Sequence, residues 1–248
     1  MISIDGYRSV LALALAVLFI AAPCALAAET SATGMKAKEG NINTDWLKNR
    51  FADDSPDNIK LRSAPGDPIA GKDKSQLCQG CHGEFGMTSE PMIPNLAGQY
   101  GRYISKELRN FQSGERTHQI MSAMAATISD ADLADIAAYF ASQRKMTGDR
   151  SGDSNPKAQV GKKLFLNGDM SRMIIACTNC HGVDGKGRAP SIWTFPVIGG
   201  QKAGYLRGQL MNWRSQERTN SPNAIMNRIA KTLTDDEIDS LAEYVSSL

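Results

Sequence analysis

The sequence predicts an all-α protein built from two copies of one small domain in tandem. Two copies are expected because matching residue patterns recur about 100 positions apart within the chain, and the longest of them, which begins at Leu96 and at Ile198, is shifted by 102 positions. Helices are expected because apolar residues recur at helical spacing, whereas no stretch alternates with the period of two that is typical of a strand. The chain has 248 residues and a net charge of +2, which excludes the strongly basic surface of a nucleic-acid-binding protein.

The first 27 residues have the pattern of a cleavable signal peptide. Arg8 precedes an apolar run over residues 10–22, Pro23 ends the run, and small residues follow at 25 and 27. An uncleaved membrane anchor is the alternative, but the run is shorter than the roughly 18 residues expected of a membrane span. The remaining chain is therefore expected to lie outside the cytoplasm.

Residues 28–65 are expected to form a polar extension with no counterpart in either copy. They are rich in Asp, Asn and Lys, with one apolar patch at Trp46, Leu47 and Phe51. We expect this segment to be mostly irregular, with at most one short helix.

The repeat divides the rest of the chain into a first domain (66–146), a linker (147–156) and a second domain (157–248). The linker is polar and rich in Gly and Ser. The second copy has additional residues around 167–175 and near 220–222. The aligned residues include Gln99, Tyr103, Leu108, Phe111 and Arg116 in the first copy and Gln201, Tyr205, Leu210, Trp213 and Arg218 in the second.

Each copy is expected to end in a capped amphipathic helix. Ser129 can cap a helix with its apolar face at Leu133, Ile136, Ala137 and Phe140. In the second copy, Thr234 and Glu237 form a capping-box pattern before Ile238, Leu241, Val245 and Leu248. The aromatic residues of the aligned set lie on a preceding helix, where we expect most of them to pack in the core.

Each copy also contains the sequence Cys-x-x-Cys-His, which is the attachment pattern of c-type heme. On one helical turn the two sulfur atoms can form thioethers with the vinyl groups of one porphyrin, and the next residue is held beneath the iron as its proximal ligand. The expected residues are Cys78, Cys81 and His82 in the first copy and Cys177, Cys180 and His181 in the second. The sequence therefore predicts two covalently bound heme c groups.

Two other chemistries use paired cysteines. A disulfide redox pair does not need the adjacent histidine, and a zinc site built from both motifs would place its ligands on two separate domains. Two such motifs at matched positions of a repeat, in an exported chain, favour heme.

The candidates for the sixth iron ligand can be narrowed by elimination. No other cysteine remains after residue 27, and His118 is the only spare histidine, so it could serve one heme at most. Methionine is the remaining common ligand. If both domains share one architecture, the matched pair is Met121 and Met226, whereas Met124 and Met211 have no methionine at the equivalent position and are expected to fill the core.

With these motifs in place, the region from about Pro68 to Leu248 resembles the cytochrome c4 family, which has two tandem class I cytochrome c domains. The resemblance rests on the heme motifs, on the sequence Pro-x-(Leu/Ile)-(Ala/Gly)-Gly-Gln, on Glu-Arg-Thr and on the late methionine. It implies that the late methionine is the axial ligand. It also implies that the carbonyls of Pro94 and Pro196 accept a hydrogen bond from the proximal imidazoles.

The same resemblance places the aligned Gln, Tyr and Arg residues near the heme or the domain interface. For Arg116 and Arg218, pairing with a heme propionate and a salt bridge at a helix end both remain open at this point.

An iron with histidine on one face and methionine on the other has no open position for a substrate. We therefore expect an electron carrier rather than an enzyme, and the resemblance implies a periplasmic shuttle. Its expected donor is a quinol-cytochrome c reductase-type complex and its acceptor a terminal oxidase or reductase, with peripheral membrane association left open. The alternatives are the diheme subunit of a flavocytochrome c sulfide dehydrogenase, or a diheme enzyme of the peroxidase or thiosulfate dehydrogenase type.

Overall fold

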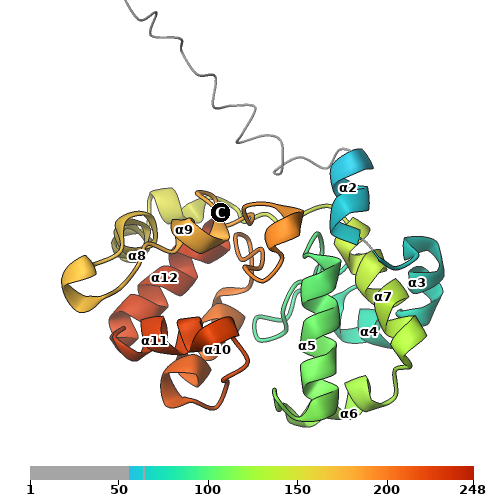
Figure 1. The fold of residues 1–248 in the computed structure, drawn as a ribbon. Coiled ribbons are helices and arrows are strands. Elements are labelled where there is room, and N and C mark those ends of the chain that lie inside the picture. Colours follow the sequence, from blue (N-terminus) through green and yellow to red (C-terminus); the bar gives the residue numbers. More distant parts are fainter. Residues whose placement is uncertain (1–55, 64) are drawn as a thin grey trace, which may run out of the picture. The chain divides into compact units, whose positions relative to one another are not determined.

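A computed structural model describes residues 56–63 and 65–248 of the chain. Its regular elements are helices, and within these residues the only β feature is an isolated bridge between Asp169 and Ile174 (Figure 1). The all-α prediction is confirmed. None of the described helices combines the length and the apolar character that a membrane-spanning helix requires.

The first copy consists of short helices around one core. Its elements are α3 (Pro68–Lys74), α4 (Gln76–His82), α5 (Gly101–Ser113), α6 (Gln119–Ala126) and α7 (Asp130–Ser142).

The second copy repeats this order and adds short 3-10 turns. Its elements are η1 (Ser151–Asp153), α8 (Pro156–Asn167), η2 (Met170–Arg172), α9 (Thr178–His181), η3 (Pro190–Ile192), α10 (Ala203–Ser215), η4 (Pro222–Ala224), α11 (Ile225–Lys231) and α12 (Asp235–Ser247). The two stretches of additional residues contain η2 and η4.

The predicted caps of the last helices are present. The Ser129 hydroxyl accepts a hydrogen bond from the Asp132 amide at the start of α7 (3.2 Å). At the start of α12, the Thr234 hydroxyl accepts from the Glu237 amide (3.2 Å), and the Glu237 carboxylate accepts from the Thr234 amide (2.9 Å). The capping box predicted from sequence is confirmed.

In each copy the last helix packs against the first. α7 lies on α3 and α12 lies on α8 (Figure 1). Glycine allows the close approach, because a Cβ atom at Gly71 would lie 1.9 Å from the Asp135 carbonyl oxygen, and one at Gly161 would lie 2.0 Å from that of Ser240. Each copy has a hydrophobic core. The first core is built from α5, α6 and α7 and includes Leu133 and Phe140, and the second includes Phe165 of α8 and Ile238 of α12.

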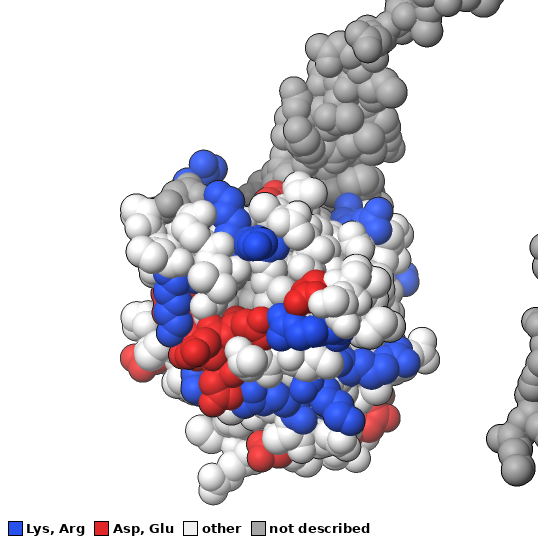
Figure 2. All heavy atoms as spheres, turned by 90° about the vertical axis from the view of Figure 1, so that its left-hand side faces the viewer, with Lys and Arg blue, Asp and Glu red and all other residues white. Residues whose placement is uncertain are grey.

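Ion pairs on the exposed side of α12 mix the two signs of charge. Asp239 pairs with Lys157 and Arg207, and Glu237 pairs with Arg172. Figure 2 shows this side of the molecule, where acidic residues are bordered by Lys and Arg. This face therefore does not present an electrostatic field of a single sign.

The segments outside the two copies include the one short helix that the sequence analysis allows, and a linker that contacts the second copy. The helix α2 (Pro56–Ser63) contacts α7, whereas the patch at Trp46, Leu47 and Phe51 lies outside the described residues. The linker is bound to the end of α12, because the Gly148 amide donates to the Leu248 carbonyl (3.0 Å) and the Arg150 amide to that of Ser247 (2.9 Å).

Candidate functional site

The helices that carry the Cys-x-x-Cys-His motifs both end at the histidine, although Cys177 of the second motif is the N-cap of its helix. α4 carries the first motif and ends at His82, and α9 ends at His181. The following residues, Gly83 and Gly182, both have φ of +82°, a left-handed conformation that favours glycine. The two copies therefore leave the motif with the same backbone geometry, as the repeat predicts.

The two histidines are buried and oriented in the same way. Their exposed fractions are 6% for His82 and 8% for His181. The Nδ1 atom of His82 lies 2.8 Å from the Pro94 carbonyl oxygen, and that of His181 lies 2.9 Å from the Pro196 carbonyl oxygen. The expectation drawn from the family resemblance for these prolines is confirmed.

This hydrogen bond determines which ring nitrogen can bind a metal. A carbonyl oxygen only accepts, so Nδ1 must carry the proton, and the neutral ring then presents an unprotonated Nε2. Burial lowers the pKa of His82 and of His181, although the proline carbonyl acts in the opposite direction. Both rings are therefore held in the neutral form that ligates a metal.

The cysteines do not have the environment of a thiol redox pair. Burial raises the pKa of Cys78, and it raises the pKa of Cys177 to about 12. Reactive cysteines need a lowered pKa, because the thiolate is the nucleophile. None of the four described cysteines forms a disulfide, and this environment suits sulfur atoms that serve as attachment points.

A bare metal site is not supported either. In the part of the chain that the structure describes, no group of three or more His, Cys, Asp or Glu side chains is placed to hold a metal ion. The zinc alternative requires such a group.

The two predicted methionines occupy equivalent helices. Met121 lies in α6 and Met226 in α11, and both side chains are half-buried. Met121 and Cys78 pack against the first core. In the second core the corresponding contacts include Cys177 and Met211, whereas Met226 is not among the packed residues.

His118 has a structural task in the first copy. Its exposed side chain caps α6, with Nδ1 accepting a hydrogen bond from the Met121 amide (3.3 Å). A histidine used as a helix cap orients the helix that carries Met121.

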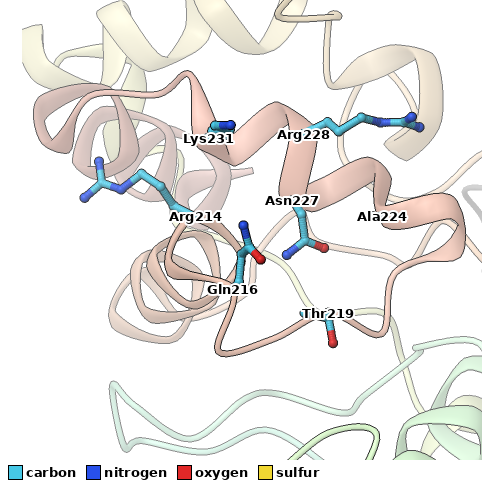
Figure 3. Close-up of a pocket in the computed structure, with 7 residues that line it drawn as sticks. All are labelled: Arg214, Gln216, Thr219, Ala224, Asn227, Arg228 and Lys231. Atoms are coloured by element: carbon cyan, nitrogen blue, oxygen red, sulfur yellow. The ribbon is translucent and has the colours of Figure 1, made fainter.

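One cavity lies beside α11, in the second copy (Figure 3). Its volume is about 280 Å³, and the side chains of Arg214 and Arg228 point away from its centre. The Asn227 amide group, which lines it, donates to the carbonyls of Trp213 (2.9 Å) and Arg218 (2.7 Å). None of the predicted heme residues lines this cavity, so it is separate from the motif on α9.

The aligned Tyr and Arg residues form contacts between the two copies. The Arg116 guanidinium donates to the Tyr205 hydroxyl (3.1 Å), and the Arg218 guanidinium donates to the Tyr103 hydroxyl (3.2 Å). The placement at the domain interface is confirmed, and Tyr103 also packs against the hydrophobic cluster of Tyr100, Met146 and Val197.

The arginines pair with a residue that the sequence analysis did not single out. Both form an ion pair with the buried Glu107. The signal was present in the repeat, because Glu107 aligns with Gln209. Alignment alone does not show that either position is buried between the copies.

Comparison with known proteins gives consistent matches. The cytochrome c family model matches residues 69–144 and 158–248. A cytochrome c4 from Pseudomonas aeruginosa is 41% identical over 76% of this chain and 92% of its own length. A thiosulfate dehydrogenase electron acceptor from Stutzerimonas stutzeri is 37% identical over 70% of this chain and 80% of its own.

A solved structure agrees with these sequence matches. The crystal structure of reduced cytochrome c4 from Pseudomonas stutzeri superposes with a TM-score of 0.68 at 37% identity. The superposition covers 74% of this chain and 99% of the solved chain.

Proposed function

Because the chain belongs to the cytochrome c family and contains two copies of its domain, we propose that it is a diheme electron carrier that transfers single electrons. The observation that carries this proposal is the matched pair of hydrogen bonds from the His82 and His181 imidazoles to the Pro94 and Pro196 carbonyls. They prepare the same ligand atom in both copies.

We assign one covalently attached heme c to each copy, because the donor set fits that group. The attachment and proximal residues are Cys78, Cys81 and His82 in the first copy and Cys177, Cys180 and His181 in the second. The buried Trp213 indole nitrogen also has no hydrogen-bond partner among the described residues, so it is a donor that an acceptor on a bound group would satisfy.

We assign the sixth ligand position to Met121 and Met226. When bound, the heme supplies a redox-active iron, and methionine ligation favours its reduced state. The protein fixes the imidazole orientation, and His82 with Met121 in the first copy and His181 with Met226 in the second would hold the iron with side chains of the chain itself. A closed iron suits outer-sphere electron transfer and disfavours turnover of a small substrate, which separates this proposal from a diheme peroxidase.

We propose that the carrier works in the periplasm, between a quinol-cytochrome c reductase-type donor and a terminal oxidase or reductase. The signal-peptide pattern of residues 1–27 supports export. A thiosulfate-oxidising enzyme is a second candidate donor, because one relative is named a thiosulfate dehydrogenase electron acceptor.

Optical spectroscopy of the purified holoprotein tests the ligand assignment. We expect two hemes per chain, a methionine–iron charge-transfer band of full intensity for both, and no binding of carbon monoxide by the reduced form. M121A and M226A should each remove half of that band and open one iron to carbon monoxide, whereas M124A should remove none. Carbon monoxide binding to the wild type would contradict the carrier proposal.

The donor candidates can be separated by stopped-flow kinetics. Reduction of the holoprotein by a quinol-oxidising complex is expected to be faster than reduction by a thiosulfate dehydrogenase. The reverse order would replace the first donor with the second.

A further inference from the structure

A buried cluster of polar side chains joins the two copies. It consists of Lys106, Glu107 and Arg116 from the first copy and Tyr205, Gln209, Arg218 and Asn220 from the second, and we call it the interface cluster. Glu107 is 7% exposed and Arg218 is 3% exposed. Buried charges of this kind are stable only when they are paired and hydrogen-bonded.

Glu107 is the centre of the cluster. Its Oε2 atom accepts hydrogen bonds from Arg116 (2.8 Å), Arg218 (2.9 Å) and the Asn220 amide (2.9 Å), and its Oε1 atom accepts from Lys106 (2.9 Å). Two of these donors belong to the first copy and two to the second. In the described residues no other carboxylate pairs with either arginine.

The position that matches Glu107 in the repeat is Gln209, which is neutral. The Gln209 Oε1 atom accepts from Arg116 (2.9 Å) and from Arg218 (2.7 Å). Each arginine therefore contacts both position 107 and position 209, one from each copy, but only one of the two positions is charged. A carboxylate at 209 would contact the same guanidinium groups.

The cluster is attached to the long helices of both copies. The Arg116 guanidinium lies 4.6 Å from the centre of the Phe111 ring on α5, and the Arg218 guanidinium lies 4.3 Å from that of Trp213 on α10. A change in the pairing of the arginines would therefore alter contacts on both α5 and α10. Domains that share a modest polar interface otherwise move relative to each other.

We infer that Glu107 is a positioning residue that fixes the two heme domains in one mutual orientation, and so fixes the path for electron transfer between them. This inference rests on the proposed diheme function. Without the carboxylate, two arginines and Lys106 remain at one buried contact with no carboxylate partner among the described residues. Their repulsion separates the copies without altering either heme motif.

The test compares the wild-type holoprotein with E107Q, Q209E and the exchange variant E107Q/Q209E. The rate of electron transfer between the hemes is measured after partial reduction by a flash-generated reductant. We expect E107Q to slow this rate by about tenfold or more, because electron and group transfer steps depend steeply on geometry. Optical spectra, the heme potentials and small-angle X-ray scattering are recorded for each variant.

The exchange variant is the decisive control. It places a carboxylate at position 209 of the second copy, next to the same two arginines. It should therefore restore the rate of electron transfer between the hemes to near the wild-type value and restore the compact scattering profile. Q209E should retain the fast rate because Glu107 is unchanged.

Three results would overturn the inference. E107Q could retain the wild-type rate, the exchange variant could stay slow, or E107Q could lose its methionine–iron band, which would show a local defect. If E107Q does not fold, the exchange variant still tests the inference. An exchange variant that folds and transfers electrons between the hemes at near the wild-type rate supports the positioning role of Glu107, and an exchange variant that does not fold rejects it. A wild type without two closed hemes would instead reject the proposed function, and that is measured first.

Discussion

The interface cluster makes the free energy of unfolding depend on pH in the acidic range, and the single substitution E107Q should abolish this dependence. Burial alone would raise the pKa of Glu107, but the positive charges of Arg218, Arg116 and Lys106 outweigh it and lower the pKa to about 2. The usual value is 4.5. The folded protein therefore binds the proton more weakly than the unfolded chain does.

The magnitude follows from this difference. A carboxyl group with a pKa of about 2 instead of 4.5 contributes roughly 3 kcal/mol to the free energy of unfolding. Because the folded pKa is the lower one, the contribution is fully present above about pH 4.5 and is lost as the pH falls towards 2. E107Q has no such group, so it should be less stable than the wild type at pH 7 and approach it near pH 2.

Denaturant unfolding of both proteins, followed by circular dichroism from pH 7 to pH 2, measures this difference. Groups common to both proteins, including the heme ligands, cancel in the comparison. D235N is the control, because Asp235 forms an exposed ion pair with Arg214 and such pairs contribute about 1 kcal/mol or less. A wild-type advantage over E107Q that stays constant across this pH range would refute the reasoning.

Three further predictions concern local geometry, each checked by thermal unfolding. Met173 is 73% exposed and its backbone is left-handed, with φ of +61°. M173G should therefore stabilise the folded protein by about 0.5–1 kcal/mol, because glycine adopts this backbone conformation without strain. The control M170G should not stabilise it. G161A should destabilise by about 1–3 kcal/mol, because its Cβ would meet a carbonyl of α12, whereas a Cβ at Gly80 would meet nothing within 4 Å and G80A should be tolerated. T234A should cost about 1 kcal/mol through the lost cap, and an unchanged melting temperature would contradict this.

The sequence was most informative where local chemistry determines structure. The capping box at Thr234 and the histidine–proline hydrogen bonds were predicted because residue spacing and the family resemblance specify them. The family resemblance placed Tyr103 and Tyr205 near the heme or the domain interface but did not specify their partners, because amphipathic spacing shows that a face is buried but not what covers it. Their hydroxyls are satisfied by arginines of the other copy, which is a long-range contact.

The role of Glu107 could not be predicted for a similar reason. A single Glu on a helix surface is normally solvated, and the Glu-to-Gln difference between the copies is a common exchange in exposed positions. Its importance arises from the arginines that meet it from both copies. Likewise, the left-handed backbone at Met173 has no signal in the residue type, because methionine rarely adopts it.

The packing of the first helix of each copy against its last has a consequence for how such a chain can be assembled. α3 lies on α7 and α8 lies on α12, so the first and last helices of each copy lie side by side, and the linker before the second copy meets the end of that copy at Ser247 and Leu248. A short connector is then enough to pass from one copy to the next without threading a loop through either. Units of this form can be duplicated, joined in series or exchanged between longer polypeptides while each keeps its own closed core.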